Sequence, residues 1–412
     1  MTYLTLAVCL LGRTSMPFKG VSILNQRISF VKSVVEEGLS VTAACLNFGI
    51  SRSGGHDLLK RFAEEGADGL ADRSRRPHGN SRSVPASTVQ QVLECKGRYP
   101  TWGPKKLYAK LKATQPEAHW PAVSTIGHIL SVAGLVGHTR RRSKPPRIGE
   151  LTQAEEANDV WCMDFKGQFL LSLALWCFPF TLTDDQTRFL LRCYGLGSTS
   201  AQGAWPILLG AFLEYGLPRV LRSDNGVPFA AASVTGLSPI SVRLIKLGIV
   251  PERIDPGSPQ QNGRHERMHR TLKNEATIPP KGTLAAQRME FDRWRAEYND
   301  ERPHEALAMK TPGSLYVAST RPYPGRIPNL EYDETMPTKK VRPNGCLRLG
   351  GQEVYIGEVL SGETIGLKAI DDQLSAVYVG VVAVAILSSA KNKLLSGTQA
   401  QPYLRVLRHD AQ

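Results

Sequence analysis

The cysteines of this chain lack the spacing of a zinc ribbon or of a disulfide-rich domain. Seven cysteines are scattered along the sequence and none forms a CxxC pair, so neither a structural zinc site nor a disulfide framework is indicated. This use of cysteine fits a reducing compartment and predicts a cytoplasmic protein. The sequence also lacks an internal repeat of about 20 to 50 residues, which would indicate a solenoid or a propeller.

Long apolar runs are missing as well. Residues 3–11 are apolar, but no basic segment precedes them as it would in a signal peptide. Met16 offers a second start for translation, so we interpret residues 1–15 as a mis-assigned start or a disordered extension. The run FLLSLALWCFPF at residues 169–180 is shorter than the roughly 20 residues that span a bilayer, and we interpret it as a buried strand. We therefore expect no membrane partner.

Acidic residues are outnumbered by basic ones. The chain has 51 Lys and Arg against 37 Asp and Glu, which gives a net charge of +14. Such a surplus favours nucleic acid or another polyanion as the partner, although a basic enzyme of another kind would show it too. With 412 residues, of which 42% are hydrophobic, the chain is long enough for about two to four domains.

Two basic, proline-containing segments, at residues 72–85 and 139–149, predict extended linkers that could also neutralise phosphates. Between the linkers the pattern is helical, and after them it becomes mixed and finally β-rich, with glycine turns. The sequence therefore predicts a helix-turn-helix DNA-binding domain at 16–71, a second helical or helix-turn-helix module at 86–138, an α/β core at 155–318 and a small β-barrel at 325–400.

The first of these domains carries a helix-turn-helix pattern. Gly49 permits the sharp turn and Ser51 can cap the next helix, which we predict at residues 51–62 as the recognition helix. Gly54 and Gly55 weaken that helix by about 1 kcal/mol each relative to alanine. The alternative is an ordinary helical hairpin. The side chains predicted to contact DNA are Arg52, Ser53, His56 and Lys60.

In the second module, Trp102 and Gly103 precede an amphipathic helix, and Ser124 is the predicted N-cap of another. A purely structural connector is the alternative reading of this module. In the third domain, four apolar runs predict strands and three segments predict helices, which together indicate an α/β sheet with mixed pairing. The predicted strands cover 158–167, 169–185, 188–196 and 218–224, and the predicted helices cover 200–215, 260–277 and 284–300.

Three acidic residues stand on three separate predicted elements of the third domain. Asp164 lies inside an apolar strand, Asp224 ends a short strand at an Asn-Gly turn, and Glu266 lies on a basic helix. Each has a simpler explanation: a salt-bridged strand residue, a turn-forming aspartate, and a helical ion pair with Arg270. Carboxylates that converge from separate elements, however, suit Mg²⁺, which prefers hard oxygen ligands.

The runs WCMDFKG, RSDNGVPF and PGSPQQNGRHERMHRTLK resemble the catalytic signatures of the integrase-like DDE transposases of bacterial insertion sequences, which are relatives of retroviral integrases. The segments GLADRSRRP and FDRWRAEYNDERPHEAL are similar to that family too, so that the resemblance covers most of residues 16–320. It implies a ribonuclease-H-like catalytic core with Asp164, Asp224 and Glu266 as catalytic residues and metal ligands. It further implies two Mg²⁺ ions in the site, with Mn²⁺ as a substitute.

The resemblance also implies a function. A protein of this family would bind the terminal inverted repeats of its element, cleave the element ends and transfer the strands into double-stranded target DNA. It would act as a homo-oligomer on paired ends, in the nucleoid-associated cytoplasm of a bacterium. Two alternatives remain: a non-catalytic DNA-binding regulator derived from a transposase, and a nuclease built on the same core.

Residues around the third acid are further candidates for contact with DNA. On a helix, Glu266, Arg270 and Lys273 share one face, which suits a phosphate that lies across the site. Gln261 and Asn262, at the start of the same helix, could contact DNA ends. Residues 170–176 depart from the family pattern, in which a short polar turn is expected between the first two strands, and we interpret them as a lengthened or locally altered hairpin.

The same helix carries a competing motif, because residues 265–269 match H-E-x-x-H, the zinc-protease pattern. In that interpretation His265 and His269 bind zinc, and Glu290 is a third ligand. The zinc-protease interpretation explains neither the runs that contain Asp164 and Asp224 nor the net positive charge of the chain. Asp184 and Asp185, near a strand end, are spare acids that could replace a metal ligand.

Overall fold

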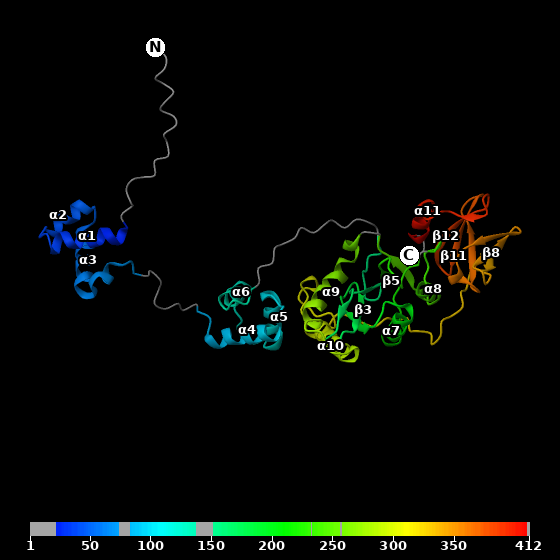
Figure 1. The fold of residues 1–412 in the computed structure, drawn as a ribbon, viewed down its shortest axis with the longest axis horizontal. Helices are drawn as coiled ribbons and strands as arrows, with labels where there is room; N and C mark the ends of the chain where they lie inside the picture. The colour runs from blue at the N-terminus through cyan, green and yellow to red at the C-terminus, as the bar shows by residue number, and fades with distance from the viewer. Residues whose placement is uncertain (1–21, 74–82, 137–150, 232, 256–257, 410–412) are drawn as a thin grey trace, which may run out of the picture. The chain divides into compact units, whose positions relative to one another are not determined.

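The computed structural model describes residues 22–73, 83–136, 151–231, 233–255 and 258–409 (Figure 1). The chain divides into two compact units, Met1–Ser83 and Val84–Gln412. The interpretation of residues 1–15, all of the linker at 139–149 and most of the linker at 72–85 lie outside the described residues. Among the helices of the described segments, none is both long and apolar enough to cross a membrane.

The first unit contains three helices and a short 3-10 turn, namely α1 (Ile23–Val35), α2 (Val41–Phe48), α3 (Arg52–Glu65) and η1 (Gly66–Leu70). A serine caps each of the three α-helices, and the cap of α3 is Ser51, whose side chain accepts from the Gly54 N–H. Gly49 ends α2 in the left-handed conformation with φ 64°, which glycine adopts without strain. The predicted turn and cap are thus confirmed.

Glycine is required at Gly55 for packing rather than for its backbone freedom. Gly55 is buried in α3 and faces α2, and a Cβ atom there would collide with Cys45 Sγ and lie 3.0 Å from Phe30 Cζ. The lower helix propensity is therefore the cost of close contact between α2, α3 and α1. At Gly54, by contrast, a Cβ would meet only the Ser51 hydroxyl at 3.2 Å.

The second unit begins with a module of three helices, α4 (Ala86–Arg98), α5 (Pro104–Thr114) and α6 (Val123–Val132). Trp102 is buried at its centre and stacks on Tyr99 with ring centroids 3.9 Å apart. Gly103 is the N-cap of α5, and proline follows at the first helical position, where its fixed φ favours the helix. The predicted cap at Ser124 is wrong, because α6 already begins at Val123.

This module is attached to the rest of the unit by polar contacts. Glu301 accepts hydrogen bonds from the Tyr99 hydroxyl and from Lys110 Nζ, the latter at 3.0 Å. Burial and the hydrogen bond to Glu301 both raise the pKa of Tyr99. Lys105 pairs with Glu305 in the same way. The module therefore contacts the segment that follows α10, rather than the sheet.

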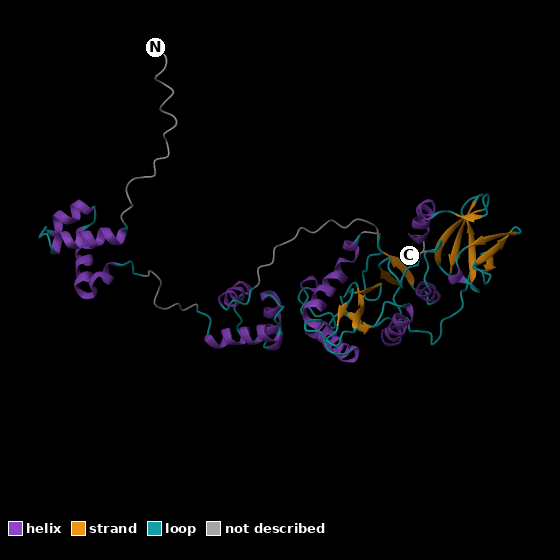
Figure 2. Ribbon diagram, viewed as in Figure 1, coloured by secondary structure: helices purple, strands orange, loops and turns teal. Residues whose placement is uncertain are grey.

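A mixed β-sheet forms the centre of the second unit (Figure 2). Its strands lie in the order β4-β3-β1-β5-β6, with β2 paired to the start of β3. The pairs β1–β3 and β3–β4 are antiparallel, whereas β1–β5 and β5–β6 are parallel, as the sequence predicts for a mixed sheet. The strands are β1 (Val160–Phe165), β2 (Phe169–Leu170), β3 (Trp176–Asp184), β4 (Leu190–Leu196), β5 (Val220–Ser223) and β6 (Val250–Arg253).

Helices cover both faces of this sheet. Alternation along β3 and β4 sends Phe180 and Leu191 into the core that contains α7, and Cys177 and Leu190 into the core that contains α9 and α10. The period of two along a strand explains this division. The covering helices are α7 (Ala201–Tyr215), α8 (Pro239–Lys246), α9 (Gly263–Ala276) and α10 (Leu284–Ala296), and the short turns η2 (Pro259–Asn262), π-helical η3 (Glu297–Glu301) and η4 (Glu305–Leu307) join them.

The single long strand predicted at residues 169–185 is wrong. The chain forms a hairpin of β2 and β3 instead. Across its turn, the Leu171 N–H donates to the Leu175 carbonyl, and the Leu171 carbonyl accepts from the Ala174 N–H. The apolar tip is not buried, since Leu173 is 65% exposed and Trp176 is 49% exposed. Periodicity alone could not separate one continuous strand from two strands and an apolar turn.

The last part of the chain is antiparallel β-structure, as predicted, but a closed barrel is not confirmed. Its main sheet has the open order β13-β12-β11-β10-β7, and β8 and β9 form a separate pair. Helix α11 (Gly397–His409) packs against β12 through Ala400 and Leu404. The strands are β7 (Thr338–Lys340), β8 (Cys346–Leu349), β9 (Gln352–Tyr355), β10 (Thr364–Ala369), β11 (Leu374–Val379), β12 (Val382–Ser388) and β13 (Lys393–Leu394), with the 3-10 turn η5 (Glu358–Leu360) after β9.

The close packing at Gly55 yields a prediction for the first unit. We expect Gly55→Ala to destabilise α2 and α3 by about 1–3 kcal/mol, the usual cost of overpacking a core. Gly54→Ala is the matched control, and we expect it to change stability by no more than about 1 kcal/mol. Hydrogen exchange of the α3 amides in the full-length chain measures both effects. Equal protection in the two variants would contradict the packing role of Gly55.

Candidate active site

Asp164 lies near the end of β1, in register with Thr181 of β3. Its side chain is 21% exposed. Burial, together with the nearby carboxylates of Asp224 and Glu266, raises the pKa of its carboxyl group to about 7. The structure therefore brings the three predicted acids within electrostatic reach of one another.

Asp224 reaches this region because β5 runs parallel to β1 beside it, and Asp224 is the residue that follows β5. Its Oδ1 accepts the Gly226 N–H at 3.0 Å, so the Asn-Gly turn predicted from the sequence fixes the carboxylate. Asn225 anchors the turn by donating to the Ile254 carbonyl at 2.6 Å. The carboxyl ends of parallel neighbours lie at one edge of a sheet, which explains why Asp164 and Asp224 converge.

Glu266 is exposed in the first turn of α9. Its neighbour His265 is buried, whereas its other neighbour, Arg267, is exposed. His265 and His269 are buried beneath the helix, on the face that rests on β3. Burial lowers the pKa of His265 to about 3 and, with help from His265 and Lys166, lowers the pKa of His269 as well. Both imidazoles are therefore neutral near pH 7.

The hydroxyl of Thr181 joins these elements. It donates to the Asp164 carbonyl at 3.1 Å and lies 2.8 Å from His265 Nε2 and 2.7 Å from His269 Nε2. A hydroxyl has one proton and two lone pairs, so both Nε2 atoms must donate to it. His265 Nδ1 then accepts from Thr183, at 2.8 Å. This network fixes the height of α9 above the strand that flanks Asp164.

The same assignment leaves His269 Nδ1 without a proton, and this atom faces Asp164 Oδ2 at 3.8 Å. A nitrogen lone pair and a carboxylate oxygen thus face one another, near two further carboxylates. Asp164, His265 and His269 offer ligand atoms that all lie within 4.8 Å of one another. Both nitrogens of His265 are already bonded to threonine hydroxyls, so the groups left to meet a divalent cation are the carboxylates around Asp164, whose repulsion a cation would relieve.

The zinc-protease interpretation of the H-E-x-x-H run does not fit this geometry. Both ring nitrogens of His265 are engaged by threonine hydroxyls. Glu290, the predicted third zinc ligand, instead forms ion pairs with Arg293 and with Lys281, the latter at 3.4 Å. The helix spacing was recognised in the sequence, but the structure assigns the two histidines to the support of α9.

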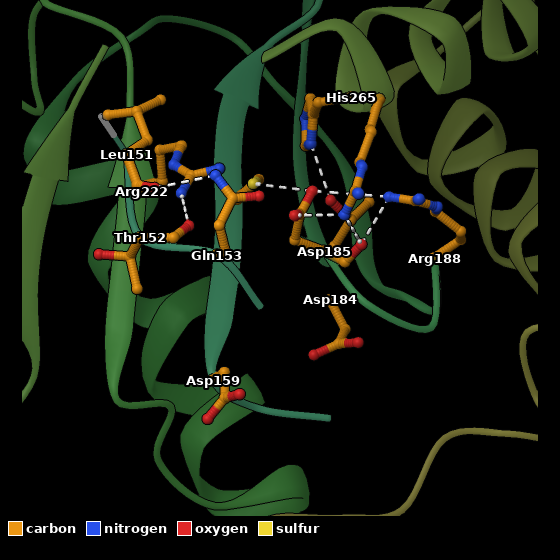
Figure 3. Close-up of polar contacts among 12 residues, drawn as sticks. Leu151, Thr152, Gln153, Asp159, Asp184, Asp185, Arg188, Arg222 and His265 are labelled. Carbon is orange, nitrogen blue, oxygen red and sulfur yellow. Dashed lines mark hydrogen bonds and ion pairs between the residues drawn. The ribbon is translucent and has the colours of Figure 1, made fainter. Parts of the chain in front are cut away.

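The two spare acids have structural partners. Asp184 accepts from the Asn158 N–H at 2.8 Å and from Thr187, which closes the turn after β3. Asp185 pairs with Arg264 Nη1 at 2.7 Å and with Arg188 at 3.6 Å (Figure 3). We therefore assign neither residue to the group of three acids.

The residues predicted to contact DNA lie in different environments. Gln261 and Asn262 are buried, and the Gln261 amide is bonded to Asp255, so a direct contact with DNA would require a change there. Arg270 and Lys273 are exposed on α9 with Glu266. On α3, all four predicted side chains, Arg52, Ser53, His56 and Lys60, are exposed. Contact with DNA remains a prediction for each of them.

Comparison with known proteins supports the sequence interpretation. Residues 247–312 match the integrase core domain family, residues 26–78 match a helix-turn-helix domain and residues 55–130 match a homeodomain-like domain. The chain is 26% identical over 247 residues to an uncharacterized 39.2 kDa protein of insertion element IS476 from Xanthomonas euvesicatoria, which covers 58% of this chain and 68% of that protein. By these matches the chain is similar to the integrase-like transposases of insertion sequences.

Further proteins are similar to parts of this chain. An uncharacterized 31.7 kDa protein of insertion element IS407 from Burkholderia multivorans is 27% identical over 187 residues, which cover 44% of this chain and 65% of that protein. The HTLV-2 integrase catalytic core domain in complex with magnesium aligns with a TM-score of 0.32 and 14% identity, over 40% of this chain and 99% of that chain. The simian T-cell lymphotropic virus intasome aligns with a TM-score of 0.35 and 18% identity, over 66% of this chain and 95% of that chain.

The domain matches contain only part of the candidate site. Glu266 lies within the matched integrase core, whereas Asp164 and Asp224 precede it. Proteins with this core generally use a divalent metal, and their chemistry is of the nuclease or transferase type. Sequence reasoning missed the support that Thr181 and Thr183 give to α9, because no local pattern marks a threonine as the partner of a histidine more than 80 residues away.

The threonine network yields a stability prediction. Thr181→Val would leave two buried Nε2–H groups and the Asp164 carbonyl without their partner, whereas Thr183→Val affects only His265. Because each buried polar group left unpaired costs about 1–3 kcal/mol, we expect Thr181→Val to destabilise the protein more than Thr183→Val, by roughly 1–2 kcal/mol. Urea unfolding midpoints provide the measurement. A larger loss for Thr183→Val would refute the hydrogen-bond assignment.

Proposed function

We propose that this protein binds the terminal inverted repeats of an insertion sequence, cleaves the element ends and transfers the strands into target DNA. The observation that carries the proposal is the convergence of Asp164, Asp224 and Glu266. The charges of Asp224 and Glu266 lie close enough to Asp164 to raise the pKa of its carboxyl group. Convergence of acids from β1, β5 and α9 suits phosphodiester chemistry that uses divalent cations. The integrase core and the helix-turn-helix domains are consistent with this function.

Asp164, Asp224 and Glu266 would hold two Mg²⁺ ions, or Mn²⁺ in their place. When bound, such ions activate the attacking oxygen and stabilise the leaving oxygen of a phosphodiester. The lone pair of His269 Nδ1 keeps the neighbouring side of Asp164 free of competing proton donors. The Asn-Gly turn holds Asp224 in place through the Gly226 N–H.

The cations beside Glu266 would position the DNA. Arg270 and Lys273 are exposed on its helix face and can bind phosphate oxygens without reading sequence. In the first unit, the exposed face of α3 would enter the major groove of the element end with Arg52 and His56. Two ends must be processed together, so we expect the protein to act as a homo-oligomer on paired ends.

The first functional prediction concerns Asp224→Asn, which removes a charge without changing the size of the side chain. We expect strand joining to fall by roughly 10³-fold or more, because the site loses one of three metal-binding carboxylates. Binding to the element end should persist, because the helix-turn-helix domain is untouched. Oligonucleotides that carry the DNA flanking this reading frame serve as substrates, in Mg²⁺, for joining and for gel-shift assays.

Asp292→Asn is the matched control, since Asp292 is 62% exposed on α10 and only weakly paired with Arg295, at 3.8 Å. This variant should join ends as the wild type does. If the wild-type protein binds ends but never joins them, the chain is a regulator rather than a transposase. If it cleaves DNA without end preference and without joining, a nuclease is the better assignment.

The second functional prediction concerns the metal itself. We expect the full-length protein to bind Mn²⁺ in the absence of DNA, and Asp164→Asn to weaken that binding by at least about tenfold. Electron paramagnetic resonance of free Mn²⁺ measures binding directly, without any need for activity. Unchanged binding in Asp164→Asn would remove this residue from the metal site, even if the chain proved to be a transposase.

A further inference from the structure

A cavity that is separate from the three acids lies where α5, α9 and the segment after α10 meet. Its volume is about 350 Å³. Five cationic side chains line it and come from four different parts of the second unit. They are Lys106, Arg188, Arg264, Arg267 and Arg302.

The cations of this pocket, which we call the cationic pocket, are only partly neutralised. Asp185 pairs with both Arg188 and Arg264. Arg302 forms two hydrogen bonds with Glu275, at 2.7 and 2.8 Å. Lys106 and Arg267 form no ion pair with any other residue in the described part of the chain. The pocket therefore keeps a surplus of positive charge.

Burial makes this surplus costly. Burial, together with the nearby Arg302, lowers the pKa of Lys106 to about 8. Burial also lowers the pKa of Arg188, as do the neighbouring Arg264 and Arg267. Asp185, Glu275 and Glu305 offset these five charges only in part, and like charges gathered in a partly buried site are destabilising unless an anion joins them. The electrostatics of the pocket thus favour an anionic ligand.

A polar atom in the lining also lacks a partner. His304 lines the cationic pocket, and its Nε2 is buried with no hydrogen-bond partner among the described residues. Buried polar atoms are normally satisfied by protein, water or ligand. A hydrated anion in the pocket would supply that partner, whereas an apolar ligand would leave Lys106, Arg267 and this nitrogen without one.

The cationic pocket is placed beside the candidate active site by helix geometry. Arg264, Arg267 and Thr271 line it from α9, at offsets of three and seven residues, and therefore share one helix face. Glu266 lies about 100–160° around the same helix from these residues, on a different face. A group bound in the pocket and a group bound at the acids would contact opposite sides of one helix turn.

We propose that the cationic pocket binds a backbone phosphate of the DNA strand that enters the candidate active site. This inference rests on the proposed function, because it names the part of the DNA that the site would hold. A phosphodiester matches the planar donor fork of arginine. Its negative charge would offset part of the surplus of the pocket. Metal ions and cationic ligands are excluded by the same charge.

The pocket would also connect two domains through the bound strand. Lys106 comes from α5, within the residues that match the homeodomain-like domain, and Arg267 comes from the catalytic helix α9. If both side chains bind one phosphate, the α4–α6 module and the helix that carries Glu266 contact the same DNA strand. Arg302 reinforces this junction by lying 5.8 Å from the ring centroid of Trp102 in the module.

The test is equilibrium binding of a short random-sequence DNA duplex to the full-length chain, in the presence of EDTA and over a range of salt concentrations. Lys106→Gln and Arg267→Gln remove the two unpaired cations without breaking an ion pair. For each, we expect the slope of log affinity against log salt to fall by about one, and affinity at moderate salt to fall roughly three- to tenfold. Arg267→Lys should recover most of the slope, because it keeps the charge.

Lys368→Gln is the matched control. It removes one exposed positive charge from β10, far along the chain from the pocket, and should leave the slope unchanged. A slope that is the same in the wild type and in both pocket variants, at equal urea midpoints, would overturn the proposal. A slope that falls equally in Lys368→Gln would also overturn it, because the effect would then reflect net charge alone.

The EDTA condition separates this proposal from the proposed function. Joining cannot occur without divalent metal, so the binding measurement does not depend on catalysis. If the pocket variants lose slope but the wild-type protein never joins DNA ends, the pocket stands and the transposase assignment fails. If the wild-type protein joins ends and the variants bind DNA as it does, the assignment stands and the pocket proposal fails.

Discussion

The mutual repulsion of three carboxylates is the constraint on which the catalytic part of this structure depends. Asp164 is largely buried and feels the charges of Asp224 and Glu266, so its ionised form is disfavoured. A fold tolerates such a cluster only where other forces fix its members. Here the fixing forces are backbone hydrogen bonds and helix packing, which do not depend on the acids themselves.

The order of the sheet provides the first of these forces. β1 lies between β3 and β5, so Asp164 is held on both sides, and Asp224 follows β5 at the same edge. The second force acts on α9, where Thr181 binds two histidine rings and Met268 and Leu272 pack into the core below. The positions of the three acids are therefore set by the sheet and by α9 rather than by the acids themselves.

Features set by neighbours in the sequence could be predicted from it. The serine cap of α3, the Gly49 turn and the Asn-Gly turn after Asp224 follow from local rules, and the structure has all three. Strand-like periodicity likewise located β1 and β4. These features need no knowledge of which distant segments meet.

Features set by distant neighbours could not be predicted. The need for glycine at Gly55 depends on Cys45 across a helix pair. The role of Thr181 depends on residues more than 80 positions away. The sequence also cannot tell whether the C-terminal strands close into a barrel, because closure depends on edge pairing rather than on strand propensity.

The charge pattern of α9 connects the cationic pocket with the acids. Its cations recur every third residue, at Arg264, Arg267, Arg270 and Lys273. Since three residues turn an α-helix by about 300°, this stripe shifts by about 60° at each step, and so winds from the pocket face to the face of Glu266. Like charges three apart destabilise a helix by a few tenths of a kcal/mol for each pair. A polyanion that follows the stripe would remove that repulsion along the whole helix, whereas a small anion could do so only at one end.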